Sequence, residues 1–161
     1  AIQFWSQNVV ELVAKALTDS GISARQLEIE LTESVVLRDN ALVDAAITGL
    51  RALGVSIVMD DFGTGFSALS DLQRYPFDKI KIDRSFVMDV ENDGAKQAII
   101  RAIVSMGRAM QLPVVAEGVE TEAQLALVAM AGCSQVQGYL LGRPGAAPSL
   151  ALENRSALRV V

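Results

Sequence analysis

The sequence predicts an α/β fold in which parallel strands alternate with helices. Three observations lead to this prediction. Strand-like and helix-like stretches alternate about five times along the 161 residues. The helix-like stretches are long enough to cross back between parallel strands, which a hairpin turn cannot do. No linker or low-complexity segment divides the chain, so we treat residues 1–161 as a single domain.

The expected helices carry apolar residues at helical spacing and are followed by residues that stop a helix. They span residues 7–20, 41–53, 95–110 and 121–131, with a short one over about 67–74. Gly21, Gly54 and Gly132 follow three of them, in the position where glycine ends a helix most readily. Thr121, with Gln124 three residues later, has the spacing of a capping box, which supports the start of the last of these helices.

The expected strands are short and rich in apolar residues. They cover residues 27–31, 55–59, 79–82, 113–116 and 134–137. The first of them, Leu27-Glu28-Ile29-Glu30-Leu31, alternates apolar and charged residues, which is the period of a strand. The residues after Pro144, namely Gly145, Ala146, Ala147 and Pro148, are typical of a loop, so residues 145–161 are expected to form a C-terminal tail or a weak helix from about Ser149.

The composition excludes several classes of function. The chain contains no histidine, so it lacks the Ser-His-Asp and Cys-His nucleophile sites, the usual His-rich zinc sites and the two-His iron site. Acid–base chemistry must therefore come from carboxylates, Lys, Tyr or a metal-bound water. The net charge of −5 argues against binding to DNA or RNA polymers, because such binding needs a basic surface.

The sequence also indicates a compartment. Its one cysteine, Cys133, cannot form an internal disulfide, which favours a reducing compartment and hence a cytoplasmic location. No membrane span is expected, because Arg51, Arg101 and Arg108 interrupt the apolar stretches before they reach roughly 18 residues.

Polar residues follow or end each expected strand. They are Glu30, the pair Asp60 and Asp61, Lys81, Glu117 and Gln137. Because the carboxyl ends of parallel strands lie on one face, we expect these side chains to converge. Carboxylate oxygens without His or Cys suit Mg²⁺, Mn²⁺ or Ca²⁺. Two such ions bridged by a shared aspartate could activate water for attack on a phosphodiester, with Lys81 holding the water or a phosphate oxygen.

Each of these residues also has a plainer explanation. The alternatives are a solvated strand end for Glu30, turn chemistry for Asp60-Asp61 and Glu117, a surface ion pair with Asp78 or Asp83 for Lys81, and a polar strand end for Gln137. The coincidence of polar residues across five strands favours a metal or catalytic site.

Five motifs, in this order and spacing, resemble those of EAL domains, which are bacterial phosphodiesterases that cut cyclic di-GMP. They are Glu30-Leu31-Thr32-Glu33-Ser34, Asp60-Asp61-Phe62-Gly63-Thr64-Gly65-Phe66-Ser67, Lys81-Ile82-Asp83-Arg84-Ser85-Phe86, Ala116-Glu117-Gly118-Val119-Glu120-Thr121 and Gln137-Gly138-Tyr139. The resemblance covers about residues 2–144. One motif alone would be unspecific, whereas five in one order are highly specific.

The resemblance implies a (β/α)₈ TIM-type barrel, of which this chain holds about the last five strand–helix units. The family's Glu-Ala-Leu strand, whose Glu is a metal ligand, and an Asn that the family also uses would fall ahead of Ala1, so the domain is expected to lack its first strands. The implied metal ligands are Glu30, Asp60, Asp61 and Glu117. The resemblance also implies that Lys81 is the partner of the catalytic water, that Gln137 positions water, and that Glu120 anchors the Asp61–Ser67 loop.

The implied activity is hydrolysis of cyclic di-GMP to linear pGpG with two Mg²⁺ or Mn²⁺ ions. The family further implies a homodimer, upstream sensor or GGDEF domains in a parent protein that could be membrane-tethered, and a role in bacterial signalling and biofilm formation. Two alternatives remain. The domain could bind cyclic di-GMP or a protein partner without cutting the nucleotide, or these 161 residues could be inactive by themselves because a metal ligand is missing.

Overall fold

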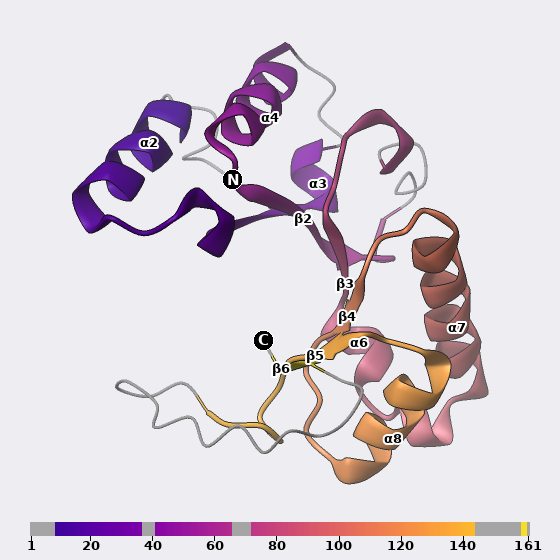
Figure 1. Cartoon of the computed structure of the whole chain (residues 1–161). Helices are drawn as coiled ribbons and strands as arrows, with labels where there is room; N and C mark the ends of the chain where they lie inside the picture. Colours follow the sequence, from indigo (N-terminus) through magenta and orange to yellow (C-terminus); the bar gives the residue numbers. More distant parts are fainter. Residues whose placement is uncertain (1–8, 37–40, 66–71, 144–158, 161) are drawn as a thin grey trace. The chain divides into compact units, whose positions relative to one another are not determined.

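The computed structural model describes residues 9–36, 41–65, 72–143 and 159–160 (Figure 1). The chain divides into two compact units, Ala1–Asp78 and Lys79–Val161, which we describe one at a time. No helix among the described residues is long and apolar enough to cross a membrane.

The first unit contains two parallel strands and the helix that connects them. Its elements are α2 (Val9–Ser20), a 3₁₀ turn η1 (Ala24–Gln26), β1 (Glu28–Thr32), α3 (Glu33–Val36), α4 (Ala41–Leu53) and β2 (Ser56–Phe62). Figure 1 shows α2 and α4 lying side by side, and α4 also packs on β2. The face of α4 that carries Val43, Ile47 and Leu50 is buried, as its helical spacing predicts.

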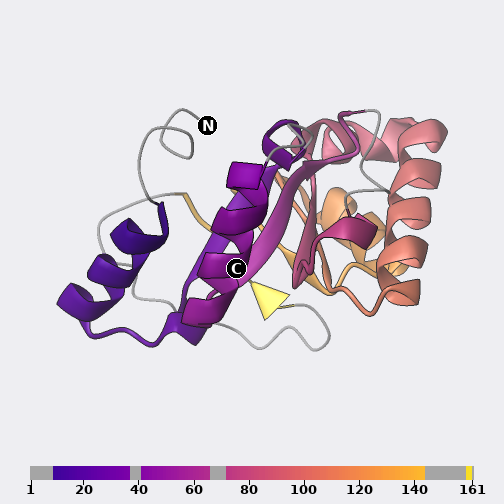
Figure 2. The same cartoon turned by 90° about the horizontal axis from the view of Figure 1, so that it is seen from above.

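The second unit is a parallel sheet with helices beside it. Its elements are β3 (Lys79–Ile82), α6 (Arg84–Val87), a 3₁₀ turn η2 (Val90–Asn92), α7 (Gly94–Ala109), β4 (Val114–Ala116), α8 (Glu122–Ala131), β5 (Gln135–Val136) and β6 (Arg159–Val160). The strands pair in parallel in the order β3-β4-β5-β6. Helix α7 runs alongside this sheet and packs on β3 and β4 (Figure 2).

The packing of α7 shows which way the side chains of β3 point. Gly107 of α7 lies so close to the sheet that an added Cβ would stand 2.4 Å from Cγ2 of Val114 and 3.9 Å from Cδ1 of Ile80. Ile80 therefore faces α7. Since successive residues of a strand point to opposite faces, Lys79 and Lys81 face away from the helix layer. Both lysines are buried all the same, with 7% and 6% of their surface exposed.

The sequence predicted the bounds of the main elements to within one or two residues, except that β2 continues to Phe62, three residues beyond the expected end. The capping box is confirmed, because Thr121 Oγ1 accepts a hydrogen bond from the backbone N–H of Gln124 at 3.1 Å. Gly132 ends α8 with a φ of 97°, a left-handed conformation that glycine adopts without a steric penalty. Of the short helix expected near residues 67–74, residues 72–74 are helical and the rest lie outside the described residues.

Five of the described elements were not predicted: the 3₁₀ turns η1 and η2, the short helices α3 and α6, and strand β6. Helices α3 and α6 have four residues each, too few to show a helical period, and α6 begins where the Asp83 carboxylate accepts a hydrogen bond from the backbone N–H of Ser85. Strand β6 falls within the segment for which we expected a tail or weak helix. Its two residues instead pair in parallel with β5. Residues 144–158, where that helix would begin, lie outside the described residues.

The one cysteine, Cys133, is buried beside the start of β5. Burial raises the pKa of its thiol to about 12. The thiol therefore stays protonated at neutral pH, and a nucleophilic role for Cys133 is ruled out on physical grounds.

Candidate functional site

Two of the predicted metal ligands lie on one face of the first unit's strand pair. In the β1–β2 register, Glu30 stands opposite Val58 and Thr32 opposite Asp60. Glu30, Thr32 and Asp60 therefore share a face, because side chains alternate along each strand and parallel partners point the same way. The Asp60 side chain is half-buried and Glu30 is exposed. Asp60 lies toward the carboxyl end of β2, whereas Glu30 is the middle residue of β1 and not its last, as the sequence had suggested.

Asp61 has an unusual backbone conformation. A regular strand would send the side chains of Asp60 and Asp61 to opposite faces. Asp61 instead has a φ of 53°, which is uncommon for a residue with a side chain and interrupts the strand alternation at this point. Its carbonyl oxygen accepts a hydrogen bond from Thr64 Oγ1 at 2.9 Å, which helps to hold this conformation. Such strained residues occur preferentially at functional sites.

The second unit brings three of the predicted residues together at the ends of neighbouring strands. Nζ of Lys81 lies 2.5 Å from Oε1 of Glu117, and their side chains are 7% and 18% exposed. Lys81 stands opposite Val115 in the β3–β4 register. Glu117 therefore lies two residues further than Lys81 toward the carboxyl ends of the strands. A surface ion pair of Lys81 with Asp78 or Asp83 is therefore wrong. Asp83 caps α6 instead, and Asp78 binds within the first unit.

Gln137 lies next to Glu117 along the sheet edge. Val115 stands opposite Gln135, and this register continued by two residues places Gln137 beside Glu117. The backbone N–H of Gln137 donates to the carbonyl of Ala116 at 2.9 Å, which continues the ladder. The Gln137 side chain is exposed. A flexible amide at this position could orient a bound water or substrate oxygen.

Glu120 is placed at the start of α8. Its side chain is exposed, and its backbone N–H donates to Oε1 of Gln124 at 2.7 Å. The structure thus gives its backbone a capping contact. The expectation that its carboxylate anchors the Asp61–Ser67 loop stays a prediction, and residues 66 and 67 of that loop lie outside the described residues.

A hydrogen bond to this loop comes from a residue to which sequence reasoning gave no role. The Oε2 atom of Glu33 accepts a hydrogen bond from the backbone N–H of Gly65 at 3.0 Å. Glu33 is only 2% exposed, and a Cβ added to Gly65 would stand 2.4 Å from Oε1 of Glu33. The carboxylate therefore holds the glycine backbone at close range. The sequence signal was weak: an acidic residue directly after a strand usually remains in solvent.

We expect Glu33→Ala to loosen this loop, because it leaves the Gly65 N–H without its acceptor. Amide exchange at Gly65, measured by hydrogen–deuterium exchange, should become faster by about tenfold. This factor corresponds to the free energy lost with one hydrogen bond to a charged group. Glu33→Gln keeps an acceptor oxygen and should give a smaller effect. An unchanged exchange rate in Glu33→Ala would contradict the anchoring role.

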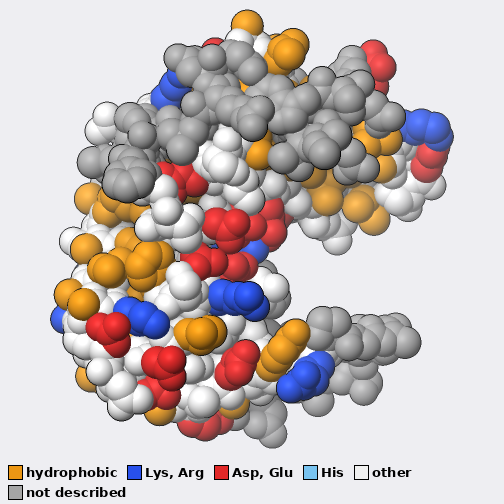
Figure 3. Space-filling view, turned by 180° about the vertical axis from the view of Figure 1, so that it is seen from behind, with side chains coloured by type: hydrophobic (Ala, Val, Ile, Leu, Met, Phe, Trp, Pro, Cys, Tyr) orange, Lys and Arg blue, Asp and Glu red, His pale blue; other side chains and the backbone are white. Residues whose placement is uncertain are grey.

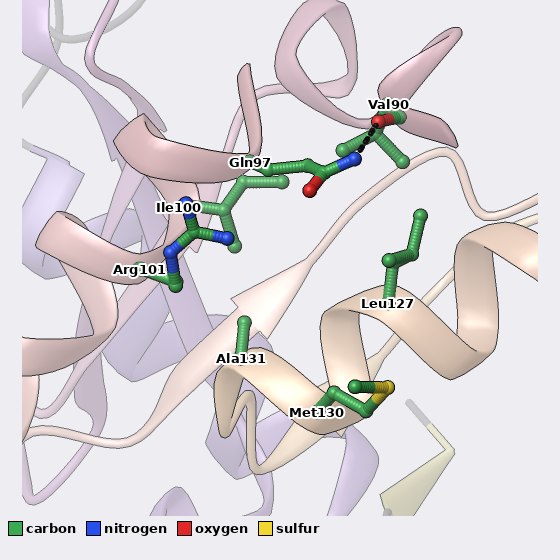
Figure 4. A pocket seen from close by; sticks show the side chains of 7 residues that line it. All are labelled: Val90, Gln97, Ile100, Arg101, Leu127, Met130 and Ala131. Atoms are coloured by element: carbon green, nitrogen blue, oxygen red, sulfur yellow. Dashed lines mark hydrogen bonds between the residues drawn. The ribbon is translucent and has the colours of Figure 1, made fainter. Parts of the chain in front are cut away.

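Two pockets lie away from the predicted site residues. One of about 160 Å³ lies between α7 and α8, and its lining residues are Val90, Gln97, Ile100, Arg101, Leu127, Met130 and Ala131 (Figure 4). None of the predicted site residues lines it. A second, beside α4, contains Tyr75, whose hydroxyl donates to Asp44 at 2.6 Å and lowers the pKa of that carboxyl. Charged and hydrophobic side chains are intermixed on the face shown in Figure 3, with no predominance of basic groups.

The chain belongs to the EAL-domain family. The family model described as "EAL domain" matches residues 2–144, which confirms the resemblance seen in the motifs. The α/β fold with parallel strands is confirmed by solved EAL structures, which superpose on this chain with 34% to 44% sequence identity. The phosphodiesterase of PaMucR, solved as a c-di-GMP complex, has a TM-score of 0.82 and 44% identity and covers 91% of this chain and 59% of that one.

Other relatives extend the comparison. A manganese/cy-diGMP complex of Klebsiella pneumoniae BlrP1 has a TM-score of 0.82 and 34% identity and covers 88% of this chain and 36% of that one. The bifunctional diguanylate cyclase/cyclic di-GMP phosphodiesterase MucR of Pseudomonas aeruginosa is 43% identical over 150 residues, which are 93% of this chain and 22% of that protein. Cyclic di-GMP phosphodiesterase NbdA of the same organism is 44% identical over 146 residues, 91% of this chain and 18% of that protein. The chain thus spans about a fifth of the length of these curated relatives.

Proposed function

We propose that this chain carries catalytic residues of a metal-dependent phosphodiesterase that hydrolyses cyclic di-GMP to linear pGpG. Membership of the EAL family supports the class of reaction. MucR and NbdA are named as cyclic di-GMP phosphodiesterases, and the PaMucR and BlrP1 structures are complexes with this nucleotide. The motif residues that follow Ala1 are all present in this sequence.

The single observation that carries the proposal is the ion pair between the buried Lys81 and the half-buried Glu117. Removing two charges from water is costly, and an ion pair repays that cost only in part. Such a pair at the carboxyl ends of two parallel strands is therefore weak evidence for stability. It stands where α/β enzymes build their active sites, so a role in chemistry explains it better.

We propose that Glu30, Asp60, Asp61 and Glu117 supply oxygen ligands to two divalent cations. The donor set fits such ions, because it consists of carboxylates only and the chain has no histidine. Hard cations such as Mg²⁺ and Mn²⁺ prefer oxygen ligands. BlrP1 was solved with manganese and with calcium, which supports this class of metal. When bound, the metal would lower the pKa of water and offset phosphate charge.

The remaining site residues would position the reactants. In the proposed reaction, a water oxygen forms a bond to one phosphorus, the bond to the ribose 3′-oxygen breaks, and that oxygen takes up a proton. The Lys81 ammonium would hold the attacking water through a hydrogen bond, and Glu117 holds that ammonium in place. The Gln137 amide would orient the same water or a phosphate oxygen. The Glu120 carboxylate is proposed to anchor the Asp61–Ser67 loop.

We propose that the protein acts as a homodimer in the cytoplasm, as part of a longer polypeptide with sensor or GGDEF domains. The relatives' much greater length supports the presence of further domains.

The test is hydrolysis of cyclic di-GMP, followed by chromatography of the product. It should be run on this chain alone and on the full-length polypeptide that carries it, before and after removal of metal by EDTA. We expect the full-length polypeptide to form pGpG, to stop when metal is removed and to recover with Mg²⁺ or Mn²⁺. Nucleotide binding without product would favour a receptor. Turnover that persists in EDTA would contradict the metal-dependent mechanism.

A further inference from the structure

An exposed aromatic ring stands at the edge of the sheet that carries the candidate site. Tyr139 follows Gln137 by two residues and is 52% exposed. The guanidinium of Arg143 lies over this ring, with its Cζ atom 4.6 Å from the ring centroid. A flat aromatic surface and a planar cation are thus held together two to six residues beyond Gln137.

The turn that carries Tyr139 is tied to the loop that carries Glu117. The backbone N–H of Val119 donates to the carbonyl of Gln137, and the N–H of Leu140 donates to the carbonyl of Val119, both at 3.0 Å. Gly138 fits closely into this arrangement, since an added Cβ would stand 2.2 Å from the carbonyl oxygen of Val119. Tyr139 is therefore fixed on both sides to the loop that begins at Glu117.

A purely structural role explains this pair poorly. An exposed Arg–Tyr stack contributes little to stability, and Tyr139 still leaves half of its surface in water. Exposed aromatic faces combined with Arg planes are, in contrast, the usual surface on which proteins stack nucleobases. The Arg donors also lie in the plane of the guanidinium, where they can reach the edge of a stacked base.

We propose that Tyr139 and Arg143 form a platform for one guanine base of the cyclic dinucleotide, an inference that rests on the proposed function. The base stacks on the exposed part of the Tyr139 ring. Arg143 donates to the O6 and N7 acceptors of guanine, whereas adenine presents an amino donor in place of O6. The pair therefore sets the preference for guanine over adenine, in addition to strengthening binding.

The ring is tested by two substitutions in the full-length polypeptide. Tyr139→Ala should raise the KM for cyclic di-GMP, or the Kd if the protein only binds, by about tenfold, with a smaller effect on kcat. Tyr139→Phe keeps the stacking surface and should restore most of the affinity. Met130→Ala is the matched surface control, because Met130 is 84% exposed on α8 and away from the platform.

Base preference tests Arg143. Arg143→Gln should lower the ratio of Kd for cyclic di-AMP to Kd for cyclic di-GMP by about tenfold. An unchanged KM or Kd in Tyr139→Ala overturns the platform. The proposed function still holds in that case, provided that the wild-type protein hydrolyses cyclic di-GMP. An unchanged ratio in Arg143→Gln overturns the base-reading role. A wild-type protein that neither binds nor cuts cyclic di-GMP overturns the proposed function and this inference with it.

Discussion

Lys81→Met should reduce cyclic di-GMP turnover at saturating substrate by about 10²- to 10⁴-fold, the usual contribution of a positioned proton-handling group. Methionine has a similar length and is apolar, so it fills the buried space without the charge. It cannot donate a hydrogen bond to the attacking water, and it leaves Glu117 without its partner at 2.5 Å. The measurement is kcat from product chromatography, with near-UV circular dichroism to confirm that the variant is folded.

The matched control is Lys79→Met on the same strand. Lys79 points to the same face as Lys81, two residues further from the carboxyl end, and is buried to the same extent. We expect this variant, where folded, to keep its turnover to within about tenfold, well short of the loss at Lys81. Equal losses in the two variants would mean that removing any buried lysine from β3 inactivates the protein, and the catalytic role of Lys81 would be wrong.

Asp60→Asn should weaken binding of Mn²⁺ by about 100-fold or more, since even residues that only support a metal ligand cost about 10- to 100-fold when changed. The amide keeps the shape of the carboxylate and its place opposite Thr32, and it removes the negative charge. Metal affinity can be measured directly by calorimetry with Mn²⁺ alone, without substrate. Turnover should fall in parallel and recover in part at high metal concentration.

Asp19→Asn provides the control for lost charge. Asp19 lies in the same unit, on the exposed surface of α2, where it pairs with Lys15. Its replacement removes one negative charge at a distance from the strand ends and should leave the Mn²⁺ affinity unchanged. If Asp60→Asn bound Mn²⁺ as tightly as the wild type, Asp60 would not be a metal ligand. The two consecutive aspartates, Asp60 and Asp61, would then need a structural explanation.

Local patterns in the sequence determined the class of fold and the chemistry of the site. The alternating period of residues 27–31, the helical period of 41–53 and the capping pair Thr121 and Gln124 each concern residues a few positions apart, and each is found in the structure. The polar residues at the strand ends could also be identified from the sequence, because the carboxyl ends of parallel strands share a face. The absence of histidine then restricted the donors to oxygen.

Tertiary structure alone decided which of these side chains meet. Lys81 and Glu117 are 36 residues apart in the sequence. The β3–β4 register brings them together, so Lys81 forms its ion pair with Glu117 and not with Asp83, which is closer in the sequence. The contact of Glu33 with Gly65 spans 32 residues, and it depends on a buried carboxylate that the sequence marks only as acidic. Strand register and loop hydrogen bonds arise from contacts between distant segments, to which periods of two and 3.6 residues are insensitive.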